Sequence, residues 1–268
     1  MNRALFRAMM KQNGKKIAKL STGIIFYEGL LTSVYPVILK NPAVTQIAES
    51  IPSPVKTVFG VSEEARMDTF EAFISGQFFA RIWVMLMALY NVETANDLIA
   101  KMIDDGTLAF LLSTPVPRDE FFSNQALVLL SGNGILAVNT LLGLYAVTYR
   151  AGIPIDRWGY LRFGLLSFTF YSLIGAYSMF FSALHAERDI AITFASGLTL
   201  AFYALDVMGG LSNKLSWVRD LSLFRFYQPQ EMLEGTVDPS RGTLGLGAGV
   251  ILLLWLGMKI FDKKDLAI

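Results

Sequence analysis

The sequence contains no cysteine and only one histidine among its 268 residues. These two shortages exclude disulfide bonds, thiolate nucleophiles, cysteine-type zinc sites and cysteine-ligated clusters, and they leave no histidine pair for a metal or a catalytic triad. Charge is also scarce, because only 17% of the residues are charged and the formal net charge is +1. The basic residues are spread among the loops and balanced by acids, so the charge pattern gives no indication of nucleic-acid binding.

Apolar residues, in contrast, make up 53% of the chain, and the mean hydropathy is +0.47. Such values are typical of a polytopic membrane protein. A helix needs about 20 mostly apolar residues to cross about 30 Å of hydrocarbon. Windows of this kind predict an all-α fold, with residues 1–268 forming one permease domain of six transmembrane helices. The six spans are expected at residues 20–39, 72–99, 121–147, 161–184, 190–211 and 244–261.

An even number of spans places both termini on the same side of the membrane. The N-terminal segment is rich in lysine and arginine, and the chain ends on the basic stretch FDKKDL followed by Ala267 and Ile268. Cytoplasmic segments carry an excess of basic residues, so both termini are expected in the cytoplasm. We therefore expect a multi-pass protein of the cell membrane, plasma or inner, in contact with the lipid bilayer.

Residues 1–19 are predicted to form an amphipathic helix. On a helical wheel with about 100° per residue, five basic side chains share one side and apolar side chains occupy the other. Such a helix lies in the membrane interface. Asn13 and Lys16 interrupt the apolar side, and a plain positive-inside signal is the alternative interpretation. The five basic residues are Arg3, Arg7, Lys11, Lys15 and Lys19.

The stretch at residues 104–118, DDGTLAFLLSTPVPR, differs from the apolar segments on both sides of it. Leu108, Leu111 and Leu112 have helical i, i+3, i+4 spacing, and prolines 115 and 117 end the pattern. A simple connector between two spans needs only a few polar residues. The stretch therefore indicates a short helix that presents an apolar stripe, either to another protein or to lipid.

Six spans, an amphipathic N-terminal helix and this acid-x-GTL-xx-LLS-x-P-xx-R pattern resemble the membrane subunits of ABC type-2 exporters. The resemblance covers nearly the whole chain. Two weaker similarities are FDKKDL at residues 261–266 and LFRFYQPQEMLEG at residues 223–235. The residues that the resemblance assigns to coupling with an ATPase are Asp104, Asp105, Gly106, Thr107, Leu108, Leu111, Leu112, Ser113, Pro115 and Arg118.

In that family, the short helix is a coupling helix that docks into a groove on a separate ATP-hydrolysing subunit. The resemblance implies two permease subunits, expected as a homodimer, with two ATPase subunits. Residues 212–235 would form short re-entrant helices on the outer side. Glu187 and Arg188, in the turn at residues 185–189, would be secondary contacts with the ATPase.

The chain itself has no G-x-x-x-x-G-K-[ST] phosphate-binding loop. It is therefore expected to be a transport subunit and not an enzyme. No cofactor is expected in this chain, since ATP and Mg²⁺ would be held by the partner subunit.

Three charged residues fall inside predicted spans, where each costs about 2.5 to 3.5 kcal/mol without a partner. They are Glu28, Arg81 and Asp206. Their positions within the spans place Arg81 and Asp206 in the outer half of the membrane, where they could pair with each other. The alternative is that these charges line a transport path. Asn133 and Asn139 are expected to form hydrogen bonds between helices.

The sequence thus favours the permease half of an ATP-driven exporter. An amphipathic peptide is the first expectation for its substrate, with a lipid or a drug as alternatives, because phenylalanine and methionine are abundant. The alternative function is an ion- or proton-coupled secondary transporter or channel. Broken helices near the middle of the membrane would favour that alternative.

Overall fold

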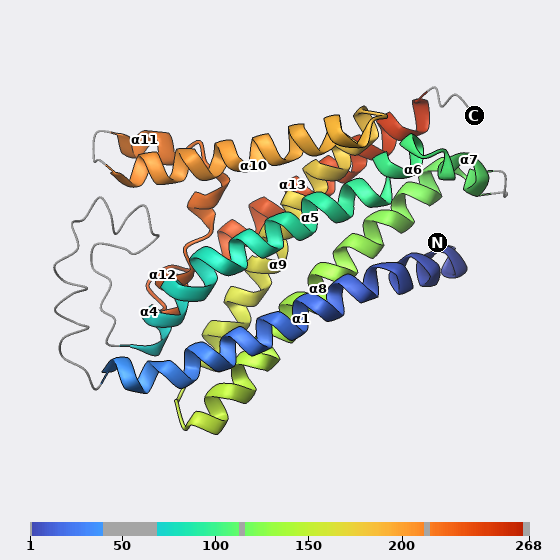
Figure 1. The fold of residues 1–268 in the computed structure, drawn as a ribbon. Helices are drawn as coiled ribbons and strands as arrows, with labels where there is room; N and C mark the ends of the chain where they lie inside the picture. Colours follow the sequence, from blue (N-terminus) through green and yellow to red (C-terminus); the bar gives the residue numbers. More distant parts are fainter. Residues whose placement is uncertain (1, 40–68, 113–115, 212–214, 265–268) are drawn as a thin grey trace.

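The computed structural model describes residues 2–39, 69–112, 116–211 and 215–264. This part of the chain consists of helices, without any strand, as the sequence predicts. The long helices are arranged as one bundle, and the short helices lie at its two ends (Figure 1). The elements are α1 (Arg3–Leu39), α4 (Phe70–Ile74), η1 (Ser75–Trp83), α5 (Val84–Leu98), α6 (Ala100–Asp104), α7 (Thr107–Leu112), α8 (Arg118–Ala151), α9 (Arg157–Leu184), α10 (Arg188–Leu211), α11 (Ser216–Arg219), η3 (Leu223–Phe226), α12 (Pro229–Leu233) and α13 (Ser240–Lys263).

Five helical segments of the described chain are long and apolar enough to cross a membrane: Phe70–Asp104, Arg118–Ala151, Arg157–Leu184, Arg188–Leu211 and Ser240–Lys263. Each contains one of the predicted spans. The remaining predicted span, residues 20–39, is helical within α1 but is not among the five. Glu28 and several serine and threonine residues lower its hydropathy. The chain is therefore a multi-pass membrane protein with five helices long and apolar enough to span, and the sixth span stays a prediction.

The first helix joins two elements that the sequence predicts separately. Residues 1–19 were expected to lie in the membrane interface as a helix of their own, whereas α1 runs without interruption from Arg3 to Leu39. Its 37 residues span about 55 Å. Two polar side chains hold its first half against α5, because Asn13 donates a hydrogen bond to Tyr90 Oη (2.8 Å) and Lys16 pairs with Asp97. The first half therefore continues the direction of the span.

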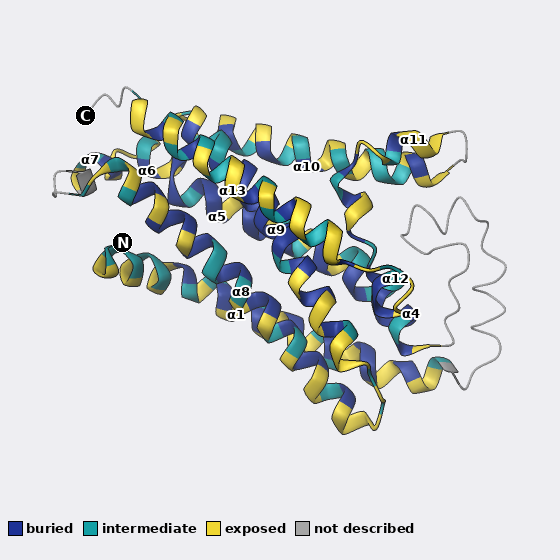
Figure 2. Cartoon of the chain, turned by 180° about the vertical axis from the view of Figure 1, so that it is seen from behind, coloured by how far each residue is buried: buried dark blue, intermediate teal, exposed yellow. Residues whose placement is uncertain are grey.

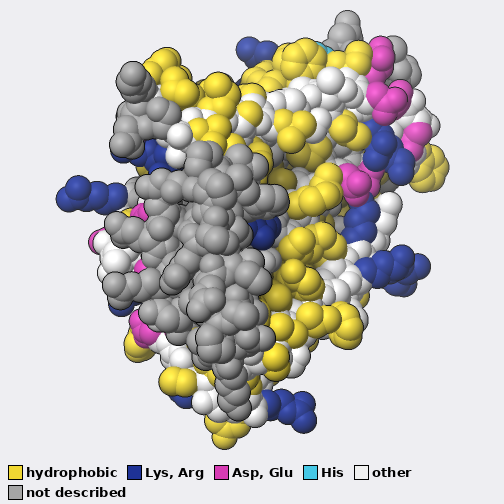
Figure 3. All heavy atoms as spheres, turned by 60° about the vertical axis from the view of Figure 1, so that its left-hand side comes forward, with side chains coloured by type: hydrophobic (Ala, Val, Ile, Leu, Met, Phe, Trp, Pro, Cys, Tyr) yellow, Lys and Arg dark blue, Asp and Glu magenta, His cyan; other side chains and the backbone are white. Residues whose placement is uncertain are grey.

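The central helix of the bundle is α9, and 83% of its most apolar window is buried. It packs against α5, α8, α10 and α13, while α1 packs mainly on α8. The corresponding buried shares for α10 and α13 are only 17% and 22%, so the outward faces of these helices are exposed (Figure 2). Figure 3 shows a band of apolar side chains over one face of the molecule, with charged side chains gathered at its edge. This distribution suits a protein surrounded by lipid.

A cluster of buried aromatic side chains holds the helices together at the end of the bundle that is far from the N-terminus. The π-helix η1 turns Phe78, Phe79 and Trp83 inward, where they are buried. Tyr227 stacks on Phe170 with 4.9 Å between ring centroids, and its hydroxyl donates to the carbonyl oxygen of Phe79 (3.2 Å). Tyr227 belongs to the stretch predicted at residues 212–235. The described part of that stretch forms α11, η3 and α12, and residues 212–214 lie outside the described residues.

Candidate functional site

Several parts of the chain meet at one end of the bundle (Figure 1). They are the beginning of α1, the elements α6 and α7, the beginning of α8, the turn between α9 and α10, and the end of α13. This arrangement brings most of the described residues that the sequence assigns to coupling to the same end as the N-terminal segment. After α5 ends at Leu98, α6 covers Ala100–Asp104, and α7 begins at Thr107. The α6–α7 element is the short helical stretch predicted between the second and third spans.

The turn between α6 and α7 gives a structural reason for Gly106 and Asp105, two of the residues that the sequence assigns to coupling. Gly106 has φ +73°, a backbone conformation that favours glycine. A Cβ at Gly106 would meet no atom within 4 Å, so the turn requires this glycine for its backbone and not for close packing within the chain. The Oδ1 atom of Asp105 accepts the backbone N–H of Thr107 at 3.0 Å. Hydrogen bonds from the hydroxyl and the N–H of Thr107 lower the pKa of Asp105.

The apolar face of α7 corrects the predicted leucine stripe. Leu108 is only 2% exposed and packs in a core cluster with Phe121, Phe122 and Phe261, so it contacts this chain and is not open to a partner. Phe110, two residues later, is 78% exposed. Leu111 and Leu112 lie in α7, but their side chains, together with Ser113 and Pro115, fall outside the described residues.

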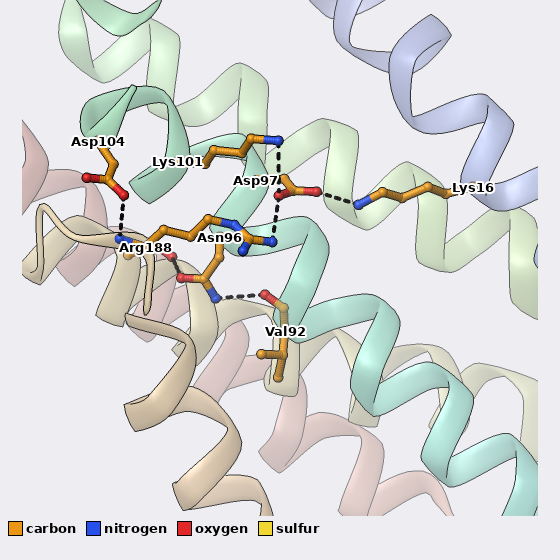
Figure 4. Close-up of polar contacts among 8 residues, drawn as sticks. Lys16, Val92, Asn96, Asp97, Lys101, Asp104 and Arg188 are labelled. Carbon is orange, nitrogen blue, oxygen red and sulfur yellow. Dashed lines mark hydrogen bonds and ion pairs between the residues drawn. The ribbon is translucent and has the colours of Figure 1, made fainter. Parts of the chain in front are cut away.

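Beside α6, three basic residues converge on one carboxylate, that of Asp97 in α5 (Figure 4). Lys16 Nζ lies 2.5 Å from Asp97 Oδ2, and Arg188 Nη2 lies 3.2 Å from Asp97 Oδ1. Lys101 Nζ lies 4.0 Å from the same Oδ1. The side chain of Asp97 is 23% exposed, so water screens these pairs only in part. We call these four residues the Asp97 hub; it joins α1, α5, α6 and α10.

Arg188, a predicted secondary contact with the ATPase, forms polar contacts within this chain. Its backbone N–H points to Asp104 Oδ2 at 3.4 Å, and its guanidinium contacts Asp97, so it holds α10 against α5 and α6 (Figure 4). The neighbouring Glu187 is exposed. Close by, Ser182 donates to Asn96 Oδ1 at 2.7 Å, which adds a link between α9 and α5. The turn between α9 and α10 is therefore attached to the α6–α7 element within this chain.

Arg118, the last residue of the predicted pattern, ties α8 to the end of α13. Its Nη1 donates to the carbonyl oxygen of Lys264 at 2.7 Å and lies 3.4 Å from that of Asp262. Lys264 Nζ donates in turn to the carbonyl oxygen of Ala183, at the end of α9 (2.8 Å). Partial burial lowers the pKa of Lys264. The basic C-terminal stretch thus takes part in the same assembly of helix ends.

Glu28 lies at a close contact between two helices, away from this end of the bundle. Its side chain is fully buried, and its carboxylate oxygens have no hydrogen-bond partner among the described residues. A Cβ at Gly143 of α8 would lie 2.6 Å from Glu28 Oε2, so only glycine leaves room for the carboxylate there. Glu28 is therefore enclosed between α1 and α8 and lines no open path in this conformation.

The other two charges within predicted spans do not form the pair expected from their depth. Asp206 Oδ1 accepts a hydrogen bond from Nε of Arg219 in α11 at 3.0 Å. Arg81 is partly buried and donates to Gln77 Oε1, one turn earlier in η1, at 3.3 Å. Asp206 finds a different partner because the short helix α11, whose position the depth of a residue does not reveal, folds back beside α10.

Amide side chains link the helices inside the bundle, as the sequence predicts. Asn133 and Asn91 exchange two hydrogen bonds of 2.9 and 3.0 Å, and Asn133 also donates to Ser172 at 3.4 Å. Asn139 donates to Ser21 Oγ at 2.8 Å. These bonds join α8 to α5, α9 and α1.

Sequence reasoning missed Asp97 and Phe110. The signal for Asp97 was present, because Asn13 and Lys16 interrupt the apolar side of the N-terminal helix, and polar residues on such a side need polar partners. Their partners are Tyr90 and Asp97 of α5. Phe110 had no such signal, since the leucine spacing favoured a different face of the short helix.

The arrangement is a set of helix ends held together by polar contacts. Within the described ranges, no group of three or more histidine, cysteine, aspartate or glutamate residues could hold a metal ion. Ion pairs and hydrogen bonds instead fasten several helix ends to the short α6–α7 element.

Comparison with known proteins agrees with this description. No significant match exists among curated proteins. A family model described as ABC-2 family transporter protein matches residues 29–266, which is most of the chain and includes α6, α7 and the hub residues Asp97, Lys101 and Arg188. The chain therefore belongs to the ABC-2 transporter family, as one of its membrane-spanning permeases.

Proposed function

We propose that this chain is the permease subunit of an ATP-driven exporter, with six spans and both termini in the cytoplasm. The observation that carries the proposal is the family match over residues 29–266. A permease of this family works with an ATPase subunit, so ATP and Mg²⁺ bind in that subunit. Two copies of the permease, expected as a homodimer, enclose the transport path. The substrate is amphipathic, with a peptide as the first candidate and a lipid or a drug next.

The α6–α7 element is the coupling helix in this proposal. Three features support the assignment: its place between the second and third spans, its position at the end where α1 begins, and its attachment to α5 and α10 through Asp97 and Arg188. Movement of an ATPase groove that holds α7 would be transmitted directly to α5 and α10, because ion pairs and hydrogen bonds hold these helices to the α6–α7 element. Phe110, with 78% of its surface exposed, replaces Leu108 as the residue expected to enter the groove.

The experiment is to replace Phe110 with aspartate and to purify the tagged permease together with its ATPase. A carboxylate buried in a dry contact without a partner costs several kcal/mol, on the order of 2–7 for a neutral polar group and more for a charge. We expect Phe110→Asp to be inserted and extracted in normal amounts but to retain little ATPase. Leu111→Asp tests the next position of α7 in the same way.

Phe226→Asp is the matched control, because Phe226 is also an exposed phenylalanine (45%) in a short helix. Its helix, η3, lies in the chain between α11 and α12, which are at the far end of the bundle (Figure 1). This variant should retain the ATPase in full. If Phe110→Asp and Leu111→Asp both keep full ATPase binding and full transport, α7 is not the docking element, and a helix resting on lipid describes it better.

A further inference from the structure

The first half of α1 carries five basic side chains at a spacing of four residues, and all five are exposed. Each step of four residues shifts the side chain by only about 40° around the helix, so these five form one stripe about 24 Å long that winds through about 160°. No acidic residue precedes Glu28 in the sequence. We call this surface the basic stripe; it consists of Arg3, Arg7, Lys11, Lys15 and Lys19.

The basic stripe does not stabilise its own helix. Like charges at i, i+4 repel each other, and no residue of the stripe forms an ion pair within the described part of the chain. Lys16 behaves differently, because it lies off the stripe and pairs with Asp97. Within the part of the chain that the structure describes, no acidic side chain offsets the repulsion within the stripe, so an anionic partner would relieve it.

The orientation of the basic stripe is fixed by the opposite side of α1. There, Leu5, Phe6 and Met9 pack against the core cluster around Leu108, and Ile17 is 5% exposed. Asn13 donates to the hydroxyl of Tyr90. Because packing and hydrogen bonding hold α1 in this rotation, the five cations face outward together.

We propose that the basic stripe binds the headgroups of anionic phospholipids. The stripe ends at Lys19, immediately before the apolar residues 20–39, so its near end lies where an apolar span meets water. Basic residues next to a span attract anionic lipids, and each contributes about a fivefold gain in affinity. Lys15 and Lys19 lie nearest to the span and are the residues of the stripe best placed to reach the headgroup layer. The proposal requires a membrane but does not depend on ATP-driven export.

The experiment uses the full chain in phosphatidylcholine nanodiscs, into which phosphatidylglycerol is titrated, and follows bound anionic lipid by native mass spectrometry. The test variant Lys11→Gln/Lys15→Gln/Lys19→Gln removes three charges and keeps similar side-chain lengths. The control variant Lys11→Arg/Lys15→Arg/Lys19→Arg keeps the charges. We expect the glutamine variant to bind phosphatidylglycerol about a hundredfold more weakly, at about fivefold per residue, and the arginine variant to behave as the wild type. High salt should weaken the wild type.

Equal phosphatidylglycerol affinity of the glutamine variant and the wild type would overturn the proposal. If that variant keeps its lipid affinity but loses the ATPase on purification, the stripe binds an acidic protein surface, and the proposal is also wrong. If the triple variant does not fold, Lys15→Gln alone still provides the test, with an expected loss of about fivefold.

Discussion

Replacing Asp97 with asparagine removes the one negative charge that three basic residues share. The shape of the side chain is kept, but Lys16 and Arg188 lose the carboxylate that they contact at 2.5 and 3.2 Å, and Lys101 loses a weaker pair at 4.0 Å. The three cations then repel each other across the joint between α1, α5, α6 and α10. We expect the helices at this end of the bundle to separate more easily.

The loss of stability caused by Asp97→Asn lies between two limits. Two charges 4 Å apart attract by about 1 kcal/mol in water and by about 4 kcal/mol at an effective dielectric constant of about 20. Exposed pairs contribute about 0.2 to 1 kcal/mol, and the side chains of Lys16 and Lys101 are 41% and 51% exposed, so the lower limit applies to them. Arg188 is less exposed, at 33%, and its bond to the carboxylate is worth about 1.5 to 3 kcal/mol. We expect Asp97→Asn to cost about 2 to 3 kcal/mol.

The assay is thermal unfolding of the purified permease, where about 2 to 3 kcal/mol corresponds to a decrease in Tm of roughly 5 to 10 °C for a chain of this size. Asp189→Asn is the control, because Asp189 is an exposed acid one residue beyond Arg188 and forms no ion pair with any described residue. High salt should reduce the difference between Asp97→Asn and the wild type.

A double-mutant cycle separates the pair from its surroundings. Asp97→Asn and Arg188→Gln should together cost less than the sum of the single substitutions, because both remove the same interaction. An unchanged Tm for Asp97→Asn, or additive losses in the cycle, would refute the reasoning that the hub holds these helices together.

Three further predictions concern single contacts. Gly106→Ala places a side chain at φ +73° and should raise amide hydrogen exchange in α7 about fivefold, at a cost of about 1 kcal/mol, whereas unchanged exchange would show that the turn can rearrange. Asn133→Leu leaves the Asn91 amide without its buried partner and should cost about 1 to 3 kcal/mol in thermal unfolding, with less than twice that loss when both residues are leucine. Arg118→Gln removes the bond to the carbonyl of Lys264 and should speed limited cleavage by trypsin at the end of α13, while equal cleavage rates would contradict the assigned bond.

The long helices could be predicted because the membrane imposes a simple rule on sequence. A span needs about 20 apolar residues, and α8, α9, α10 and α13 each contain such a window inside longer helices. The rule does not report where a helix ends in water, so it could not show that α1 continues through residues 3–19. Packing decides that question, since Asn13 and Lys16 find their partners on α5, about 80 residues away in sequence.

The candidate site was only partly predictable for a similar reason. The α6–α7 element and Gly106 follow from local sequence, because proline, glycine and aspartate act on their neighbours. The burial of Leu108 and the exposure of Phe110 depend on α8 and α13, which supply Phe122 and Phe261 to the cluster that receives Leu108. Helical spacing identifies residues that share a side of α7 but does not say which side meets the bundle.

Because α1 is one continuous helix, it can move as a rigid lever. A helix about 55 Å long that tilts by about 5° moves one end by about 5 Å relative to the other, without breaking any hydrogen bond of its backbone. Lys16 lies in the first half of this helix, and Tyr35, which packs on the rings of Phe70 and Phe73, lies near its last residue. An angular displacement at the hub would thus be transmitted to the distant aromatic contacts, and the close contact between Glu28 and Gly143 lies between the two.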